Sequence, residues 1–446
     1  MRDFLVVMMV LGSVPLTLAN PMVGVLMWFW LSLMNPHRLA WGYAQNFRVA
    51  LIVGSATLIG WMFSSDSKRP PNSPLMYLLA IFTIWVSLAA FFSIHPEFAM
   101  PRWEEDVKIL LMTFVTTCIV RSRERINQLV WVIVFSLGYY GVKGGFFALA
   151  TGGSYRVYGP EQSFIADNND LALALIMTLP LMLYLLTTVK RRVVQAGLIA
   201  SIGLTGVSIL ASYSRGALLG LAFTLGALWF RSRHRVFTGV VMAVVVVGTL
   251  MWLPPQWFDR MHTIEEYTQD ESVQGRFDAW LFAFRIALDH PILGGGQLVG
   301  SDEQLFLKYV PTAPTARAAH SIYFQVLGET GFVGLAIYLA LLIGSFVAAG
   351  NILRATRNRP DLAWARNLAG MLQASLVGYS VSGAFLSRSF FDLYYALVAL
   401  IAVLQFVVQR ETAKSVPPAR ASTGGPMADA KPRIAPAPSL VPVSDV

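Results

Sequence analysis

The chain has 446 residues, of which 55% are hydrophobic and only 13% are charged, and it carries a net charge of +9. Because a soluble globular protein averages about 25% charged residues, this composition excludes an ordinary soluble enzyme, a disordered protein and a collagen. It predicts an all-α polytopic membrane protein. A membrane-spanning helix needs about 20 apolar residues, and the apolar runs provide for about 12 of them.

The first apolar segment, residues 3–34, begins like a signal peptide, but the apolar run resumes directly after Asn20-Pro21. We therefore expect an uncleaved first crossing. It should be broken near residues 20–21, because proline removes a backbone donor and clashes inside a helix. Eight more crossings complete transmembrane helices 1–9 of residues 1–253, near 46–63, 74–93, 106–120, 126–150, 169–189, 193–211, 216–230 and 236–253.

One long loop, residues 254–320, separates these crossings from transmembrane helices 10–12 in residues 321–409, which are expected near 321–349, 367–386 and 390–408. The loop should contain two helical stretches, near 259–268 and 274–290. A turn at Gly294-Gly295-Gly296 follows them and lacks the Lys-Ser/Thr of a P-loop. Residues 410–446 are rich in Pro, Ala and Ser without periodicity, which predicts a disordered cytoplasmic tail.

Basic residues indicate the topology. Arginines and lysines gather in short clusters between apolar runs, as in cytoplasmic loops, and this pattern favours topology over nucleic-acid binding. The opposite loops are poorer in positive charge, so the clusters and both termini are predicted to be cytoplasmic and the loop 254–320 periplasmic. The clusters are Lys68-Arg69, Arg121/Arg123/Arg125, Lys190-Arg191-Arg192, Arg231/Arg233/Arg235 and Arg354/Arg357/Arg359/Arg366.

Chemistry is expected outside the cytoplasm, where a histidine and several arginines are found. His320 ends the long loop at the start of an apolar helix, and an imidazole with a pKa near 6.5 can accept a hydroxyl proton there. The alternative is an interfacial histidine with no chemical role. Arg215 opens a helix on the side that disfavours arginine, with Ser214 as its N-cap. Arg276 and Arg285 lie on the second loop helix, either binding phosphate or solvating its surface.

Further polar residues lie on the same side of the predicted membrane. Asp167 or Asn169 is expected to cap the next helix, and Arg388 and Asp392 are candidates for a local ion pair. Glu329 is nine residues from His320, which places it on the opposite face of a helix and about 13 Å away. Arg156, Tyr158 and Arg388 join Arg215, Arg276 and Arg285 as candidates for binding substrate.

Several motifs are absent from the sequence. It contains no HExxH, GxSxG, DxD or Rossmann fingerprint, no Cys/His metal spacing and only one cysteine, Cys118. We therefore expect neither a metal nor a cofactor.

Three segments, in order and spacing, resemble a known family. SRGALLGL, then GR…W…A…HPILGGG, then AHSIYFQVLGETGFVG are similar to the signature region of the bacterial O-antigen ligase and polymerase superfamily, over roughly residues 205–350. The N-terminal part, with NPHRLAWG, resembles the branch of O-glycosylation ligases associated with exosortase systems.

The resemblance implies a metal-independent glycosyltransferase of the bacterial inner membrane with a periplasmic active site. Its donor would be a glycan on undecaprenyl pyrophosphate and its acceptor the lipid A core. By position, His320 matches the family's loop-to-helix histidine, Arg215 the arginine opening its helix, and Arg276 its loop arginine. This chain has His320-Ser321 where the family often has His-Asn. We expect an inverting displacement in which His320 accepts or orients the acceptor hydroxyl while Arg215 and Arg276 hold the pyrophosphate.

Three alternatives stay open at this point. The same donor chemistry could serve a protein acceptor (an O-oligosaccharyltransferase) or a growing glycan (an O-antigen polymerase). A glycolipid transporter would instead place its polar groups at mid-membrane on broken helices. A structural membrane component would leave Arg215 unexplained.

Overall fold

The computed structural model describes residues 1–40, 42–232, 234–252, 254–262 and 271–414, and every regular element in these ranges is a helix. The predicted all-helical class is therefore confirmed for this part of the chain. Two predictions fall partly outside it: residues 263–268 of the first loop helix, and residues 415–446 of the tail. Within the predicted tail, helix α16 (Asp392–Lys414) continues past residue 410.

The N-terminal helices form an antiparallel pair. Helix α1 (Arg2–Ala19) ends at Asn20, whose side chain accepts a hydrogen bond from Met22 N–H (3.1 Å) and caps α2 (Pro21–Met34). The carboxylate of Asp3, at the start of α1, accepts hydrogen bonds from Gly42 (2.9 Å) and Ala44 (3.1 Å), which follow α2. The chain thus reverses at Asn20, whereas the sequence predicted one crossing with a break.

Residues 1–408 form one compact unit built from the helices that follow. Helices α7 and α16 are apolar on all faces and largely buried inside it, as expected of core helices in a bundle. The remaining helices are α3 (Val49–Phe63), α4 (Pro74–Phe91), α5 (Pro96–Ile119), α6 (Arg123–Ala150), α7 (Asn168–Thr188), α8 (Arg192–Leu210), α9 (Arg215–Arg231), α10 (Arg235–Trp252), α11 (Pro255–His262), α12 (Glu271–Asp289), α13 (Glu303–Tyr309), α14 (Ile322–Ala355) and α15 (Ala363–Ser382).

Seven helices of the described residues are long and apolar enough to cross a membrane: α1, α4, α6, α7, α8, α14 and α16. Three shorter apolar helices are α2, α3 and residues Arg235–Gly248 of α10. Helix α5 carries several charges in its first half. The chain therefore has the helices of a membrane protein, and the number of about 12 crossings stays a prediction.

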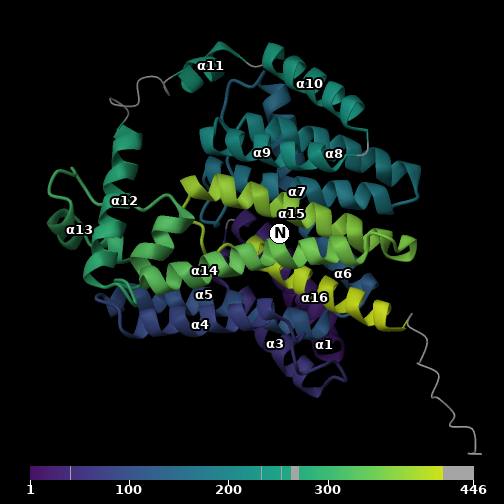
Figure 1. Ribbon diagram of the computed structural model, residues 1–446, viewed down its shortest axis with the longest axis horizontal. Coiled ribbons are helices and arrows are strands. Elements are labelled where there is room, and N and C mark those ends of the chain that lie inside the picture. The colour runs from purple at the N-terminus through teal and green to yellow at the C-terminus, as the bar shows by residue number, and fades with distance from the viewer. Residues whose placement is uncertain (41, 233, 253, 263–270, 415–446) are drawn as a thin grey trace, which may run out of the picture. The chain divides into compact units, whose positions relative to one another are not determined.

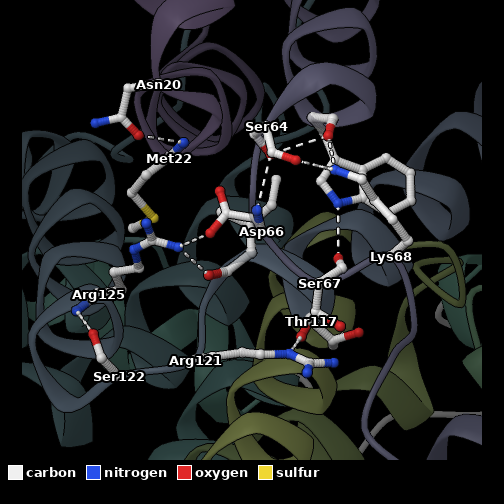
Figure 2. Close-up of polar contacts among 12 residues, drawn as sticks. Asn20, Met22, Ser64, Asp66, Ser67, Lys68, Thr117, Arg121, Ser122 and Arg125 are labelled. Carbon is white, nitrogen blue, oxygen red and sulfur yellow. Dashed lines mark hydrogen bonds and ion pairs between the residues drawn. The ribbon is translucent and has the colours of Figure 1, made fainter.

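Several of the basic clusters lie together at one end of the helices, which we call the basic end. Arg125 forms an ion pair with Asp66 (2.6 Å), and Figure 2 shows this pair beside Lys68 and Arg121. The Arg123 guanidinium lies over the Trp364 ring, 5.0 Å from its centroid. Further contacts at the same end join Arg231 to Gln373, and Asn367 to Thr187 near the end of α7.

Helix α14 is interrupted near its first third. Gly331 has φ +74° and ψ −176°, a conformation open to glycine. The predicted turn at Gly294-Gly295-Gly296 lies against this break, where Gly295 and Gly296 donate hydrogen bonds to the carbonyls of Gly328 (2.9 Å) and Glu329 (3.0 Å). The loop helix α12 thereby lies beside the start of α14, and α13 packs against α12 (Figure 1).

Candidate active site

A cavity of about 510 Å³ lies beside the first residues of α7, at the end of that helix opposite Thr187 and the basic end. Four segments build it: the start of α7, the second turn of α12, the loop before α14, and the loop between α15 and α16. Its lining residues are Asp167, Asn169, Asp170, Gly275, Arg276, Arg317, Ala318, His320, Leu386, Ser387 and Arg388.

His320 is fixed to the cavity wall by its backbone. Its φ of +43° lies in the left-handed region, which costs a non-glycine residue about 1–3 kcal/mol. Two hydrogen bonds support this conformation: His320 N–H donates to Ser387 Oγ (2.8 Å), and the Trp280 indole donates to the Ala319 carbonyl (2.8 Å). Trp280 in turn stacks on Phe324 of α14, with ring centroids 4.9 Å apart. The backbone of His320 is therefore held in a defined position although the residue precedes the helix.

The surroundings of His320 lower its pKa from the usual value near 6.5. Loss of water around the ring is the larger cause and the positive charge of Arg276 the second, while the carboxylates of Asp170 and Asp167 act in the opposite direction. The result is a neutral imidazole at pH 7, which is the form that accepts a proton.

Arg388 forms its ion pair with Asp170 of α7, not with Asp392. The predicted Arg388–Asp392 pair is therefore wrong: Asp392 begins α16, where it accepts a hydrogen bond from Ser32 Oγ (3.0 Å). The buried Nε of Arg388 has no hydrogen-bond partner among the described residues. Asp170 pairs with Nη2 of Arg388, and a guanidinium has five N–H donors. Arg388 can therefore also donate hydrogen bonds to an anion in the cavity.

Arg317 completes the set of cavity cations, and it was not among the predicted site residues. Its aliphatic part crosses Gly275, where an added Cβ would lie 2.5 Å from Arg317 Cδ. Gly275 therefore allows Arg317 to lie beside Arg276. The signal was the segment ARAAH, which places an arginine three residues before His320 in irregular chain.

The structure does not bring all predicted site residues to this cavity. Arg215 is the first residue of α9, with Ser214 as the predicted N-cap accepting from Ala217 N–H (3.1 Å), and it is not among the cavity-lining residues. Arg285 donates to the Tyr309 carbonyl and so joins α12 to α13. Arg156 and Tyr158 line a second cavity.

Helix capping near the cavity agrees with the sequence. Asp167 is the N-cap of α7, where its carboxylate accepts from Asn169 N–H (2.8 Å). The Glu329 carboxylate accepts a hydrogen bond from Leu298 N–H (3.3 Å), just after the glycine turn. Gln325 donates to Glu329 (3.3 Å) and accepts from Ser389 N–H (3.2 Å), so it links Glu329 to the loop between α15 and α16. Among the described residues no group of three or more His, Cys, Asp or Glu side chains is placed to hold a metal ion.

Together these observations describe an all-helical protein with membrane-length helices and one cavity that combines an imidazole with three guanidinium groups. Such a site suits a polyanionic substrate. Residues 200–339 match the O-antigen ligase family, and residues 1–190 match a family of unknown function, DUF5935. The comparison with curated proteins found no match. The chain thus contains an O-antigen ligase domain at residues 200–339, which supports membership of the O-antigen ligase superfamily.

The matched family is one of glycosyltransferase-like enzymes, and the match suggests a ligase or polymerase role in O-antigen processing. The matched region contains His320, Arg276 and Arg317, whereas Asp170 comes from the N-terminal family and Arg388 lies outside both. The cavity is therefore assembled from three parts of the chain, and the family match covers only one of them.

Proposed function

We propose that the protein is an O-antigen ligase, which transfers a glycan from undecaprenyl pyrophosphate to the lipid A core in lipopolysaccharide maturation. The observation that carries this proposal is the cavity in which His320 lies among Arg276, Arg317 and Arg388. A lipid-linked diphosphate needs several cations, and guanidinium groups bind phosphate oxygens in a bidentate manner. An acceptor hydroxyl needs a base, and the neutral imidazole is one.

The proposed location is the periplasmic face of the bacterial inner membrane. Lysines and arginines accumulate in cytoplasmic loops, and the basic end of the helices is opposite the cavity along α7. If the basic end is cytoplasmic, His320 faces the periplasm, where lipid-linked glycans and the lipid A core are both found once they have crossed the membrane.

In the proposed mechanism, the acceptor oxygen attacks the anomeric carbon of the donor in one inverting displacement. The new C–O bond forms as the bond between that carbon and the phosphate oxygen breaks. His320 accepts the proton of the acceptor hydroxyl, and undecaprenyl pyrophosphate leaves. Arg276, Arg317 and Arg388 compensate the charge that develops on the leaving group, an effect of several kcal/mol in comparable sites.

The proposal needs neither a metal ion nor a cofactor, because the guanidinium groups supply the positive charge. Arg215 takes a secondary role in it. This residue starts α9, where an added Cβ on the neighbouring Gly216 would lie 3.1 Å from Phe385, next to the cavity-lining Leu386. We propose that Arg215 binds the lipid-linked diphosphate as it approaches the cavity, and that Arg276 binds the diphosphate inside the cavity.

The test is glycan transfer by the purified full chain in proteoliposomes that contain undecaprenyl-pyrophosphate-linked glycan, with lipid A core, free glycan-lipid and a periplasmic protein extract as competing acceptors. Glycan on lipid A core supports the ligase. Glycan on protein would replace it with a protein O-oligosaccharyltransferase, and chain extension with an O-antigen polymerase. A folded protein that moves the lipid between leaflets without transfer would be a transporter.

A further inference from the structure

A second cavity, of about 330 Å³, lies where the last turns of α6 meet the loop before α7. Its walls combine two cations and a phenol with apolar side chains. Lys143, Arg156 and Tyr158 are its polar groups, and Phe147, Val157 and Pro160 are among the apolar ones. None of these residues lines the cavity of His320.

The two cations are not engaged by the protein. Lys143 and Arg156 are both exposed, and within the described ranges neither side chain makes an ion pair or a hydrogen bond. Arg125 at the basic end, in contrast, has its ion pair with Asp66. Two unneutralised positive charges at one small cavity attract an anion.

The loop that carries Arg156 is held in place against α6. Val157 N–H donates to the Ala211 carbonyl (3.0 Å), and Gly159 N–H donates to the Ala166 carbonyl (3.1 Å). At Gly144 an added Cβ would lie 2.6 Å from Val157 Cγ1, so only glycine lets the loop approach α6 this closely. The backbone that carries Arg156 is therefore held next to the turn of α6 that carries Lys143 before any ligand binds, which lowers the entropic cost of binding.

If Arg123 lies at one membrane surface, the length of α6 places Lys143 at the depth of the lipid phosphate groups of the other surface. Lys143 is 20 residues along α6 from Arg123 of the basic end, which at 1.5 Å per residue is about 30 Å, the thickness of the hydrocarbon core. Residues at four-residue steps share one face of a helix, and Phe135, Tyr139 and Phe147 lie in such steps with Lys143. Their exposed fractions of 67%, 43% and 45% show that this aromatic face is open.

We infer that this second cavity binds the phosphate group of a membrane lipid, with Lys143 and Arg156 as its cations and the lipid chain lying along Phe135, Tyr139 and Phe147. An inorganic phosphate would satisfy the cations but would leave the apolar walls and the aromatic face uncovered. A phosphorylated lipid covers both.

The second cavity lies close to the proposed transfer site. Ala211, which Val157 contacts, is next to Ser212, whose carbonyl accepts from Asn168 Nδ2 (2.6 Å) at the start of α7. Arg215 follows three residues later. A lipid phosphate bound here is thus positioned beside the helix start that leads to the His320 cavity. The identity of this lipid as the polyprenyl carrier rests on the proposed function. The binding of a lipid phosphate at this cavity is independent of the proposed function.

The test is photo-crosslinking from position 139. The full chain with p-benzoylphenylalanine in place of Tyr139 is reconstituted in phosphatidylethanolamine vesicles with radiolabelled undecaprenyl phosphate. We expect the crosslink yield to fall at least tenfold in K143Q/R156Q and to persist in the charge-conserving K143R/R156K. The matched control K190Q/R191Q removes one lysine and one arginine that are exposed beyond the other end of α7, and it should keep the yield.

Competition identifies the lipid. Excess phosphatidylglycerol that lowers the yield as strongly as unlabelled undecaprenyl phosphate supports a bulk-lipid headgroup site, and a weak effect supports a site for the polyprenyl carrier. An unchanged yield in K143Q/R156Q, or equal competition by uncharged undecaprenol, overturns the inference. Crosslinking needs no turnover, so absence of glycan transfer with an intact, Lys143/Arg156-dependent crosslink contradicts the proposed function alone.

Discussion

The two ends of the helical bundle use their positive charges differently. At the basic end, the protein itself supplies partners: Asp66 pairs with Arg125, Asp361 pairs with Arg359, and Trp364 lies under Arg123. At the opposite end, Arg276, Arg317 and Arg388 line one cavity, and Lys143 and Arg156 another. Arg388 pairs with Asp170, whereas Lys143 and Arg156 have no ion pair or hydrogen bond within the described residues.

On the proposed function, the charges of the basic end set the topology and the charges at the cavities bind the substrate and the lipid. The sequence shows only that the basic end is richer in lysine and arginine. The structure adds that the arginines of the poorer end converge on cavities. Substitutions at the two ends should therefore have unequal effects on turnover.

Removing the imidazole should cost the most. We expect His320→Ala to lower the transfer rate by about 10²- to 10⁴-fold, the usual contribution of a general base. His320→Asn is the matched variant, because asparagine also tolerates a positive φ but cannot accept the proton in the same way. Equal losses in both variants, measured as initial rates at unchanged Tm, indicate chemistry. A normal rate in His320→Asn would exclude the general-base role.

Removing a cavity cation should come next. Arg317→Gln is expected to lower turnover by about 10²-fold, as loss of one group that stabilises developing negative charge does, and to leave Tm unchanged because Arg317 lies in irregular chain.

Arg388→Gln should lower Tm as well as turnover, since it leaves the buried Asp170 unpaired. Adding Asp170→Asn should restore Tm but not turnover. Restored turnover would show that Arg388 only supports the fold.

The pH profile of kcat/KM should shift when a charge beside His320 is removed. Turnover needs the neutral imidazole, so the rate rises with pH through the pKa of His320, which lies below 6.5. Arg276 lowers that pKa, so Arg276→Gln should move the acidic limb to higher pH. Asp167 raises it, so Asp167→Asn should move the limb to lower pH. Opposite signs, measured from pH 4.5 to 8, distinguish this electrostatic coupling from loss of binding alone.

Breaking an ion pair at the basic end should have the smallest effect. Asp66→Asn removes the partner of Arg125 in a partly exposed pair, and such pairs contribute about 0–1 kcal/mol. We expect the transfer rate of folded protein to stay within about twofold and Tm to fall slightly. A loss as large as that of Arg317→Gln would remove the distinction between the two ends.

The sequence predicted the elements that depend on local pattern. The apolar runs predicted the helices, Ser214 and Asp167 were predicted as N-caps, and the three glycines predicted a turn. It did not predict the reversal at Asn20 or the break in α14 at Gly331, because both depend on neighbours: Asp3 contacts the chain after α2, and the glycine turn satisfies carbonyls freed in α14.

The sequence predicted only part of the candidate site, because the rest depends on contacts between segments that are distant in the chain. His320 and Arg276 stand in segments that resemble the family, and they do line one cavity. Arg388 was expected to pair with the near neighbour Asp392, but its partner is Asp170, 218 positions away in the chain. For Arg317 the sequence offered only its place three residues before His320, and its position beside Arg276 depends on the contact with Gly275. Contacts between distant segments decide these positions, and spacing along the chain does not encode them.

The most direct test of the account is the rate at which undecaprenyl pyrophosphate is released together with glycan transfer to lipid A core, in proteoliposomes, for the wild-type chain, His320→Ala, Arg317→Gln and Asp66→Asn. The account predicts coupled release and transfer in the wild type and in Asp66→Asn, and strong loss of both in the two cavity variants. Transfer that persists in His320→Ala and Arg317→Gln but fails in Asp66→Asn would contradict it.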